Sequence, residues 1–139
     1  MHCFLIDMKL IVCLDQKDGM SFNRRRQSSD RKLSERLLEL VGEERLWMNA
    51  YSAKLFENLP ENVTVDEDFL KKAGAGDWCF AENVSLLPAA GKIDALIVYR
   101  WEKVYPADKK YPFDKGEKVG EFAFAGNSHE VITEEVYKP

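Results

Sequence analysis

Apolar and polar positions alternate along the chain in short blocks, as expected for strands and helices in turn. Residues 9–14 form a continuous apolar run rich in branched side chains, which predicts a strand buried on both faces. A helix with one apolar face follows, with Ser28 or Ser29 as its N-cap and Gly42 at its end. The apolar face of this helix consists of Leu33, Leu37, Leu38, Leu40 and Val41.

The rest of the chain continues this alternation. The further predicted strands are 45–49, 62–65, 77–81 and 93–101, and the further predicted helices are 52–58 and 66–73. Segment 82–92 is left open because Pro88 interrupts its helical pattern. A C-terminal hairpin is predicted from two strands, 120–124 and 130–137, which the turn 126–128 joins. This order indicates a single three-layer α/β domain with a mostly parallel mixed sheet and a C-terminal antiparallel hairpin.

Composition agrees with a globular protein of one domain. The chain has 139 residues, of which 45% are hydrophobic and 32% charged. Its longest apolar stretch is far shorter than the roughly 20 residues that cross a bilayer, and residues 1–7 lack the basic start of a signal peptide. We therefore expect a cytoplasmic protein without a membrane partner. Because Met8 directly precedes the first strand, we expect a domain over 8–139 and an N-terminal extension over 1–7.

The net charge and the number of cysteines and histidines limit the functions that the sequence supports. The net charge of -4 argues against a broad nucleic-acid surface, which needs clustered basic residues. Three scattered cysteines and two histidines, His2 and His129, form neither a disulfide framework nor a zinc motif. His129 itself is interpreted as a turn or surface residue.

The long polar segment 15–27 shows neither helical nor strand periodicity, and it contains the one basic cluster, Arg24 to Arg26. Arginine offers fixed pairs of donors for a phosphate or an RNA backbone. Gln27 follows this cluster as part of the same candidate segment, and Phe22 and Asn23 add a ring and an amide that suit a base. The alternative is a solvated loop without a ligand.

Several segments, in order, resemble the dihydrofolate reductase family. The late strand and loop of that family are similar to 96–112, where a hydrophobic strand leads to Ala107-Asp108 and Tyr111-Pro112. The other similar segments are 8–12, 18–20, 46–48, 56–60, 127–129 and 132–137. The resemblance implies the fold of that family over nearly the whole chain from Met8.

The resemblance also implies site residues, with changes. The family's Gly-Arg-x-Thr phosphate turn falls at 49–52, where only Ser52 is similar, and its Gly-Gly pair falls near Ala81-Glu82, where a carboxylate would repel phosphate. NADPH is the cofactor that the family implies, but these motifs are largely lost. The substrate-orienting carboxylate aligns with Asp30, and the threonine that partners it aligns with Tyr99.

Three functional hypotheses follow. The first is a diverged member of this fold that binds a small pterin-like or nucleotide ligand near Phe22, Asp30 and Tyr99, with Asp30 as the candidate catalytic group. The second is an RNA-associated protein or nuclease that uses Arg24 to Arg26, since the chain also resembles short bacterial proteins called ribonuclease Z. True enzymes of that name need a His-x-His-x-Asp-His zinc cluster, which two histidines cannot supply. The third is a non-catalytic interaction domain, and no oligomeric state is predicted.

Overall fold

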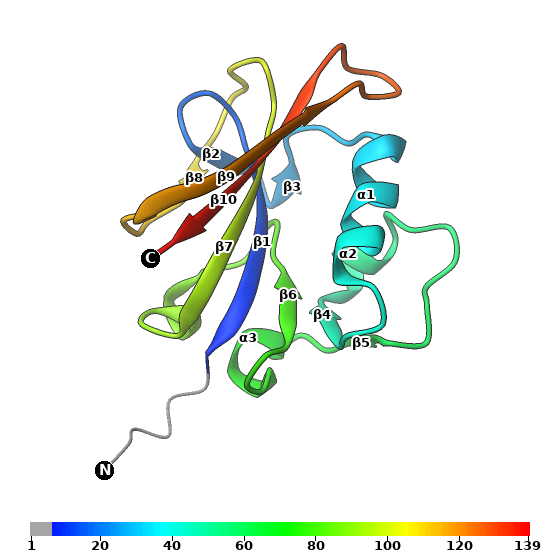
Figure 1. The fold of residues 1–139 in the computed structure, drawn as a ribbon, viewed down its shortest axis with the longest axis vertical. Coiled ribbons are helices and arrows are strands. Elements are labelled where there is room, and N and C mark those ends of the chain that lie inside the picture. Colours follow the sequence, from blue (N-terminus) through cyan, green and yellow to red (C-terminus); the bar gives the residue numbers. More distant parts are fainter. Residues whose placement is uncertain (1–6) are drawn as a thin grey trace.

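Seven strands within residues 7–139, the part of the chain that the structure describes, form one curved sheet (Figure 1). Across the sheet they are β5 (Val63–Val65), β4 (Leu46–Met48), β6 (Trp78–Phe80), β1 (Met8–Leu14), β7 (Ile93–Arg100), β10 (Ile132–Lys138) and β9 (Glu117–Phe124). The first five strands are parallel, whereas β10 runs antiparallel to both β7 and β9. This computed structural model confirms the predicted α/β domain with a mostly parallel mixed sheet.

The most apolar segment of the sequence becomes the centre of the sheet. Strand β1 lies between β6 and β7, and Leu10 and Val12 pack into the hydrophobic core on one face. Ile11, between them, packs into the core on the other face. Because side chains of a strand alternate between faces, a run that is apolar at successive positions supplies both cores. The predicted strand buried on both faces is confirmed.

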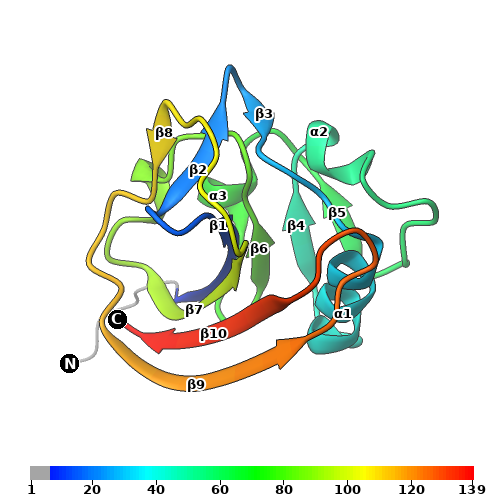
Figure 2. The ribbon, with the colours of Figure 1, turned by 90° about the horizontal axis from the view of Figure 1, so that it is seen from above.

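Helical segments cover the two faces of the sheet (Figure 2). Helix α1 (Arg31–Val41) packs on one face, while α3 (Phe69–Lys72) and the short 3-10 helix η1 (Leu87–Ala89) contribute to the core of the other. A further short helix, α2 (Ala50–Ala53), follows β4. No helix within the described residues is long and apolar enough to cross a membrane.

Helix α1 forms where the strongest helical pattern predicts it, but its N-cap residue differs from the prediction. Leu33, Leu37 and Val41 are its buried residues, and Gly42, with φ of 63°, ends it by donating to the Leu38 carbonyl. The N-cap is Asp30, and not Ser28 or Ser29, because the Asp30 carboxylate accepts the Lys32 N–H at 2.8 Å.

The polar segment 15–27 contains strands that its pattern did not predict. Strand β2 (Gly19–Phe22) pairs with β3 (Arg25–Arg26) and with β8 (Lys109–Lys110) in a small second sheet. Strands this short carry too few residues for a period to be visible. The outer partner of β2 is β8, which follows β7 and lies far from β2 in sequence, so the tertiary structure decides that this small sheet forms.

Other boundaries also differ from the prediction. The helix expected over 52–58 is α2, which begins earlier because the Asn49 side chain caps the Ser52 N–H at 2.9 Å. The helix expected over 66–73 shortens to α3, since the Asp66 carboxylate forms a local turn with the Asp68 N–H at 2.8 Å. The final hairpin has the connection 125–131 in place of the three-residue turn. Of the predicted extension 1–7, all but Asp7 lies outside the described residues.

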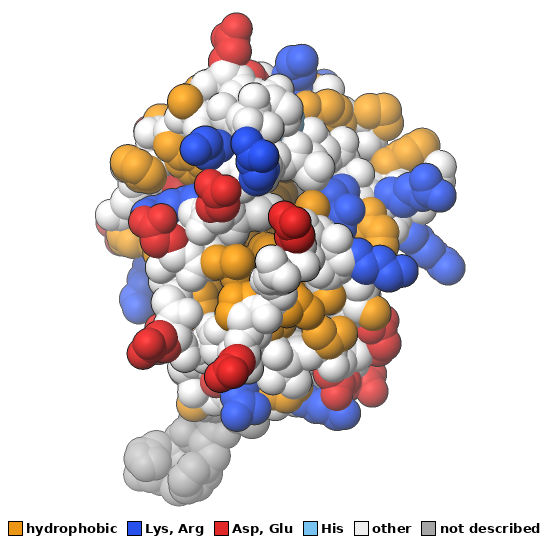
Figure 3. All heavy atoms as spheres, turned by 90° about the vertical axis from the view of Figure 1, so that its right-hand side faces the viewer, with side chains coloured by type: hydrophobic (Ala, Val, Ile, Leu, Met, Phe, Trp, Pro, Cys, Tyr) orange, Lys and Arg blue, Asp and Glu red, His pale blue; other side chains and the backbone are white. Residues whose placement is uncertain are grey.

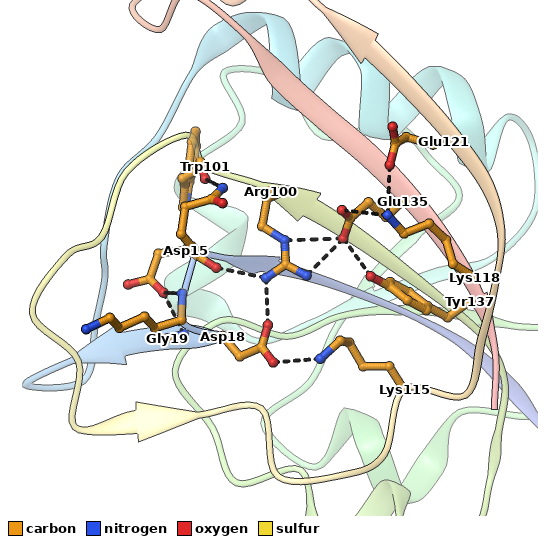
Figure 4. Close-up of polar contacts among 12 residues, drawn as sticks. Asp15, Asp18, Gly19, Arg100, Trp101, Lys115, Lys118, Glu121, Glu135 and Tyr137 are labelled. Atoms are coloured by element: carbon orange, nitrogen blue, oxygen red, sulfur yellow. Dashed lines mark hydrogen bonds and ion pairs between the residues drawn. The ribbon is translucent and has the colours of Figure 1, made fainter.

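Arg100, at the end of β7, joins the main sheet to the loop that precedes β2 (Figure 4). Its guanidinium donates to Glu135 at 2.9 Å and to Asp18 at 2.6 Å, and Asp18 also pairs with Lys115 at 2.6 Å. Although burial raises the pKa of Asp18, hydrogen bonds from Lys115 and Arg100 hold it below its usual range. These ion pairs fix the starting point of the β2–β3 hairpin.

Candidate functional site

Five of the residues predicted to bind a ligand line one cleft beside the β2–β3 hairpin. This hairpin cleft has a volume of about 480 Å³ and is closed on its other side by the loop after β7. Its lining residues are Phe22, Asn23, Arg25, Arg26, Gln27, Tyr105 and Pro106. The volume falls in the range of pockets that hold small ligands.

The turn of the hairpin sets the direction of its functional side chains. Asn23 and Arg24 have φ of 51° and 62°, as in the two-residue turn whose twist suits a β-hairpin. The Asn23 N–H donates to the Asp108 carboxylate at 3.1 Å, which ties the turn to the opposite loop. Phe22 and Arg25 face each other across the hairpin, and the Phe22 residue is 43% exposed. An exposed ring and a cation therefore lie side by side.

Buried Asp15 fixes two residues that line the cleft, Gln27 and Tyr105. Its carboxylate accepts the Tyr105 N–H at 3.0 Å and the Gln27 amide at 3.0 Å. Burial raises the pKa of Asp15, but hydrogen bonds from the N–H groups of Tyr105, Gly19 and Lys17 outweigh it and hold the pKa below its usual range. The Gln27 carbonyl oxygen is buried without a hydrogen-bond partner among the described residues. It is an acceptor that a ligand N–H can satisfy.

The three neighbouring arginines do not act as one basic patch. Arg26 forms a bidentate ion pair with Glu82, at 2.7 and 2.9 Å, and its guanidinium lies 4.3 Å from the centre of the Tyr51 ring. The side chain of Glu82 is 4% exposed. Arg24 and Arg25, by contrast, have no acidic partner within 4.0 Å in the described part of the chain. Among the described residues that line the hairpin cleft, Arg25 is therefore the cation without an acidic partner.

The positions that the resemblance assigned to cofactor phosphates are filled by protein groups. The Ser52 hydroxyl donates to Glu82 at 2.8 Å, so the two positions are in direct contact. Two of the first N–H groups of α2 already have acceptors: Ala50 donates to the Glu67 carboxylate at 2.8 Å and Ser52 donates to the Asn49 side chain at 2.9 Å. A phosphate here would meet the Glu67 and Glu82 carboxylates, and the Ala50 and Ser52 N–H groups already have acceptors. The residues present do not fit the phosphates of NADP(H).

Asp30 is held under the connection between β9 and β10. Its side chain is fully buried, and its carboxylate accepts the N–H groups of Asn127 and Ser128, the latter at 2.8 Å. His129 Nδ1 lies 3.0 Å from the same carboxylate. Although burial raises the pKa of Asp30, these hydrogen bonds and that of Lys32 hold it far below its usual range. Asp30 does not line the hairpin cleft.

Tyr99 is also absent from the cleft. It is fully buried in β7, and its hydroxyl donates to Glu134 at 2.9 Å. Burial and the neighbouring Glu134 carboxylate raise the pKa of Tyr99, so the hydroxyl stays protonated. Ser52 likewise points into the Glu82 cluster. Of the eight predicted ligand-binding residues, the structure thus brings five together and places Asp30, Ser52 and Tyr99 in other surroundings.

A second hollow, the His129 hollow, lies beside the first. It measures about 690 Å³, and its lining residues are Ser28, Glu102, Lys103, Tyr105, Ser128, His129 and Glu130. Ser28 Oγ lies 2.9 Å from His129 Nε2, a pairing that the sequence analysis did not predict. The pattern Ser-Ser-Asp and the distant Asn-Ser-His offered only capping and turn signals, so no local signal joins them.

The face formed by α1 and α2 has a further hollow (Figure 3). It measures about 450 Å³, and hydrophobic side chains lie within it between charged ones. Leu38, Leu55 and Phe56 supply apolar surface, and Arg31 and Glu35 are among its charged residues.

The cysteines and the groups that could ligate a metal ion lie apart in the described residues. Within residues 7–139, no group of three or more histidine, cysteine, aspartate or glutamate side chains is placed to hold a metal ion. Burial raises the pKa of Cys13, and it raises that of Cys79 to about 12. Neither thiol is a reactive thiolate at neutral pH.

The sheet order and the flanking helices define an α/β fold with its clefts beyond the carboxyl ends of the central strands. Among solved structures, the chain is similar to dihydrofolate reductase from Enterococcus faecalis in complex with NADP(H) and RAB-propyl. The TM-score is 0.69, 95% of each chain is covered, and 11% of the aligned residues are identical. The chain therefore has a dihydrofolate reductase-like fold. No known protein family and no curated protein matches the sequence, and nothing supports the resemblance to ribonuclease Z.

Proposed function

We propose that this chain is a diverged dihydrofolate reductase-like protein that binds a small anionic ring compound, of the pterin-like or nucleotide class, in the hairpin cleft. The observation that carries the proposal is the joint presence of Phe22, Arg25 and Gln27 along one cleft of about 480 Å³. Each supplies a different interaction: a ring face, a free cation and an acceptor without a partner.

The ring of the ligand would stack on Phe22. The exposed side of this phenylalanine lies against the cleft, whose far wall contains Pro106 and Tyr105. Stacking of a base on an aromatic side chain contributes about 1–3 kcal/mol. Polar ring N–H groups would then reach the Gln27 carbonyl oxygen, which is costly to leave unsatisfied when buried.

The phosphate or carboxylate of the ligand would bind Arg25. Its guanidinium has no acidic partner within 4.0 Å among the described residues, so binding does not require an ion pair to break. Arg26 is held by Glu82 and would shape the wall of the cleft. The E. faecalis enzyme is complexed with NADP(H), but the Glu82 and Glu67 carboxylates favour a ligand smaller than a dinucleotide.

Ligand binding can be measured by the melting temperature, which rises when a ligand binds the folded state. The panel consists of mononucleotides, folates, NADPH, NADP and a short RNA, each with wild type and the Arg25→Ala variant. Arg45→Ala is the matched control, since Arg45 is an exposed arginine just before β4, at the opposite end of the parallel strands.

We expect a mononucleotide or a folate to raise the melting temperature of wild type and of Arg45→Ala, with the rise lost in Arg25→Ala. A rise that persists in Arg25→Ala would overturn the assignment of the cleft, as would the absence of any rise. Stabilisation by RNA alone would instead favour the RNA hypothesis.

A further inference from the structure

Ser28 and His129 line the His129 hollow, and the buried Asp30 continues their hydrogen-bonded row behind the imidazole. Ser28 Oγ lies 2.9 Å from His129 Nε2, and His129 Nδ1 lies 3.0 Å from Asp30 Oδ2. Because the Asp30 carboxylate accepts a proton donor at Nδ1, Nε2 is left to accept the hydrogen of the Ser28 hydroxyl. We propose that Ser28 and His129, positioned by Asp30, form an acyl-transfer site for small uncharged carboxylic esters.

The imidazole is held on three sides. Its Nδ1 edge faces Asp30, its Nε2 edge faces Ser28, and its ring stacks on Trp101, with centroids 4.6 Å apart and planes 30° apart. The His129 side chain is 8% exposed. A base that is fixed in orientation and largely shielded from water is what proton transfer from a serine requires.

The aspartate is equally fixed. N–H groups of Asn127 and Ser128 donate to its carboxylate, as does the Lys32 N–H that begins α1. These bonds already tie the β9–β10 connection to the helix. The contact between Ser28 and His129 is therefore not needed to hold that connection, and Ser28 does not cap α1.

The charged residues around Ser28 and His129 determine which kind of ester suits the site. Glu102 and Glu130 line the hollow and disfavour an anionic substrate, while Lys103 supplies one positive charge for an oxyanion. The hollow of about 690 Å³ is open on the surface, which suits a short acyl group. Tyr105 lines both this hollow and the hairpin cleft, so the two sites are neighbours.

The chemistry balances with water as the only co-reactant. Ser28 Oγ attacks the ester carbonyl carbon while its proton passes to His129 Nε2. The bond from that carbon to the alcohol oxygen breaks, and the leaving oxygen takes the proton from Nε2. Water then attacks the acyl-serine, with His129 accepting a water proton and returning it to Ser28 Oγ. The products are one carboxylic acid and one alcohol.

The test combines covalent labelling with turnover. A fluorophosphonate probe, which reacts only with an activated serine, is incubated with the full chain, and the modified peptide is located by mass spectrometry. Hydrolysis of p-nitrophenyl acetate is followed in parallel. The variants are Ser28→Ala and His129→Gln, and Ser29→Ala is the control because it removes the neighbouring exposed hydroxyl.

We expect the label on Ser28 in wild type and in Ser29→Ala, and its loss in Ser28→Ala and His129→Gln. In the latter two variants, ester hydrolysis should fall by about 100-fold or more. In an Asp30→Asn variant that still melts cooperatively, kcat falls while KM is unchanged. Absence of label from folded wild type, or hydrolysis equal in Ser28→Ala and Ser29→Ala, would overturn the proposal and leave Ser28 and His129 a structural contact. Neither result bears on ligand binding at Arg25.

Discussion

Arg26 and Glu82 form a bidentate ion pair, at 2.7 and 2.9 Å, that fastens the β2–β3 hairpin to the segment directly after β6. Both oxygens of the Glu82 carboxylate are used, and the Ser52 hydroxyl donates to one of them at 2.8 Å. Glu82 and Ser52 are at the positions where the resemblance placed the Gly-Gly pair and the phosphate turn. The Glu82 carboxylate is thus satisfied by groups of the protein itself.

Loss of Arg26 is expected to destabilise the fold. In Arg26→Ala, the Glu82 carboxylate, whose side chain is 4% exposed, loses its counter-charge, and the free energy of unfolding should fall by about 3 kcal/mol. Arg24→Ala is the control, since removal of an exposed arginine should change the free energy of unfolding by less than about 0.5 kcal/mol. Urea unfolding followed by circular dichroism measures both. Equal effects would show that the pair does not stabilise the hairpin.

The Asp30 carboxylate should make stability depend on acid pH. Its folded-state pKa lies below the unfolded value of about 4, so the folded state binds fewer protons and stability falls as the pH drops below that value. The difference in unfolding free energy between wild type and Asp30→Asn should therefore be largest near pH 5 and shrink toward pH 2. Urea unfolding across this range provides the measurement. A difference that stays constant with pH would contradict the assigned cause.

Gly116 should be the least replaceable of the glycines with positive φ. Its φ is 79°, and a side chain there would collide with the carbonyl oxygen of Lys138. Gly91 has a φ of 74° but open space around it, so Gly91→Ala should cost about 1 kcal/mol from conformation alone. Gly116→Ala should cost a further 1–3 kcal/mol or so, because the backbone must shift. Thermal unfolding of the two variants compares them directly, and equal melting temperatures would exclude the collision.

Phe22 should affect ligand binding and not stability. Because this side chain is 43% exposed, Phe22→Ala should leave the melting temperature of the free protein nearly unchanged. Loss of stacking should weaken binding of a mononucleotide by about 10-fold, measured by isothermal titration calorimetry. Phe122, which is 49% exposed on β9, provides the matched control. Equal affinity of the two variants would remove the stacking step from the proposed function.

Much of the fold was predictable because its signals are local. The apolar run of β1 and the single apolar face of α1 predict their elements without any knowledge of partners. Gly42 ends its helix as predicted, through a φ that glycine adopts freely. The strands β2 and β3 were missed because their pairing with each other and that of β2 with β8 stabilise them, and not a pattern of their own.

The candidate sites were likewise predictable only where their residues are neighbours in the sequence. The sequence by itself determined the cluster from Phe22 to Gln27 as a candidate binding segment, since these residues are neighbours in the chain and in the hairpin cleft. Only the tertiary structure decided that Arg26 is neutralised by Glu82 and that His129 meets both Ser28 and Asp30. These partners lie far apart in sequence, and their distances depend on how the sheet brings loops together. Spacing along a chain carries no information about such contacts, because the fold alone sets which loops become neighbours.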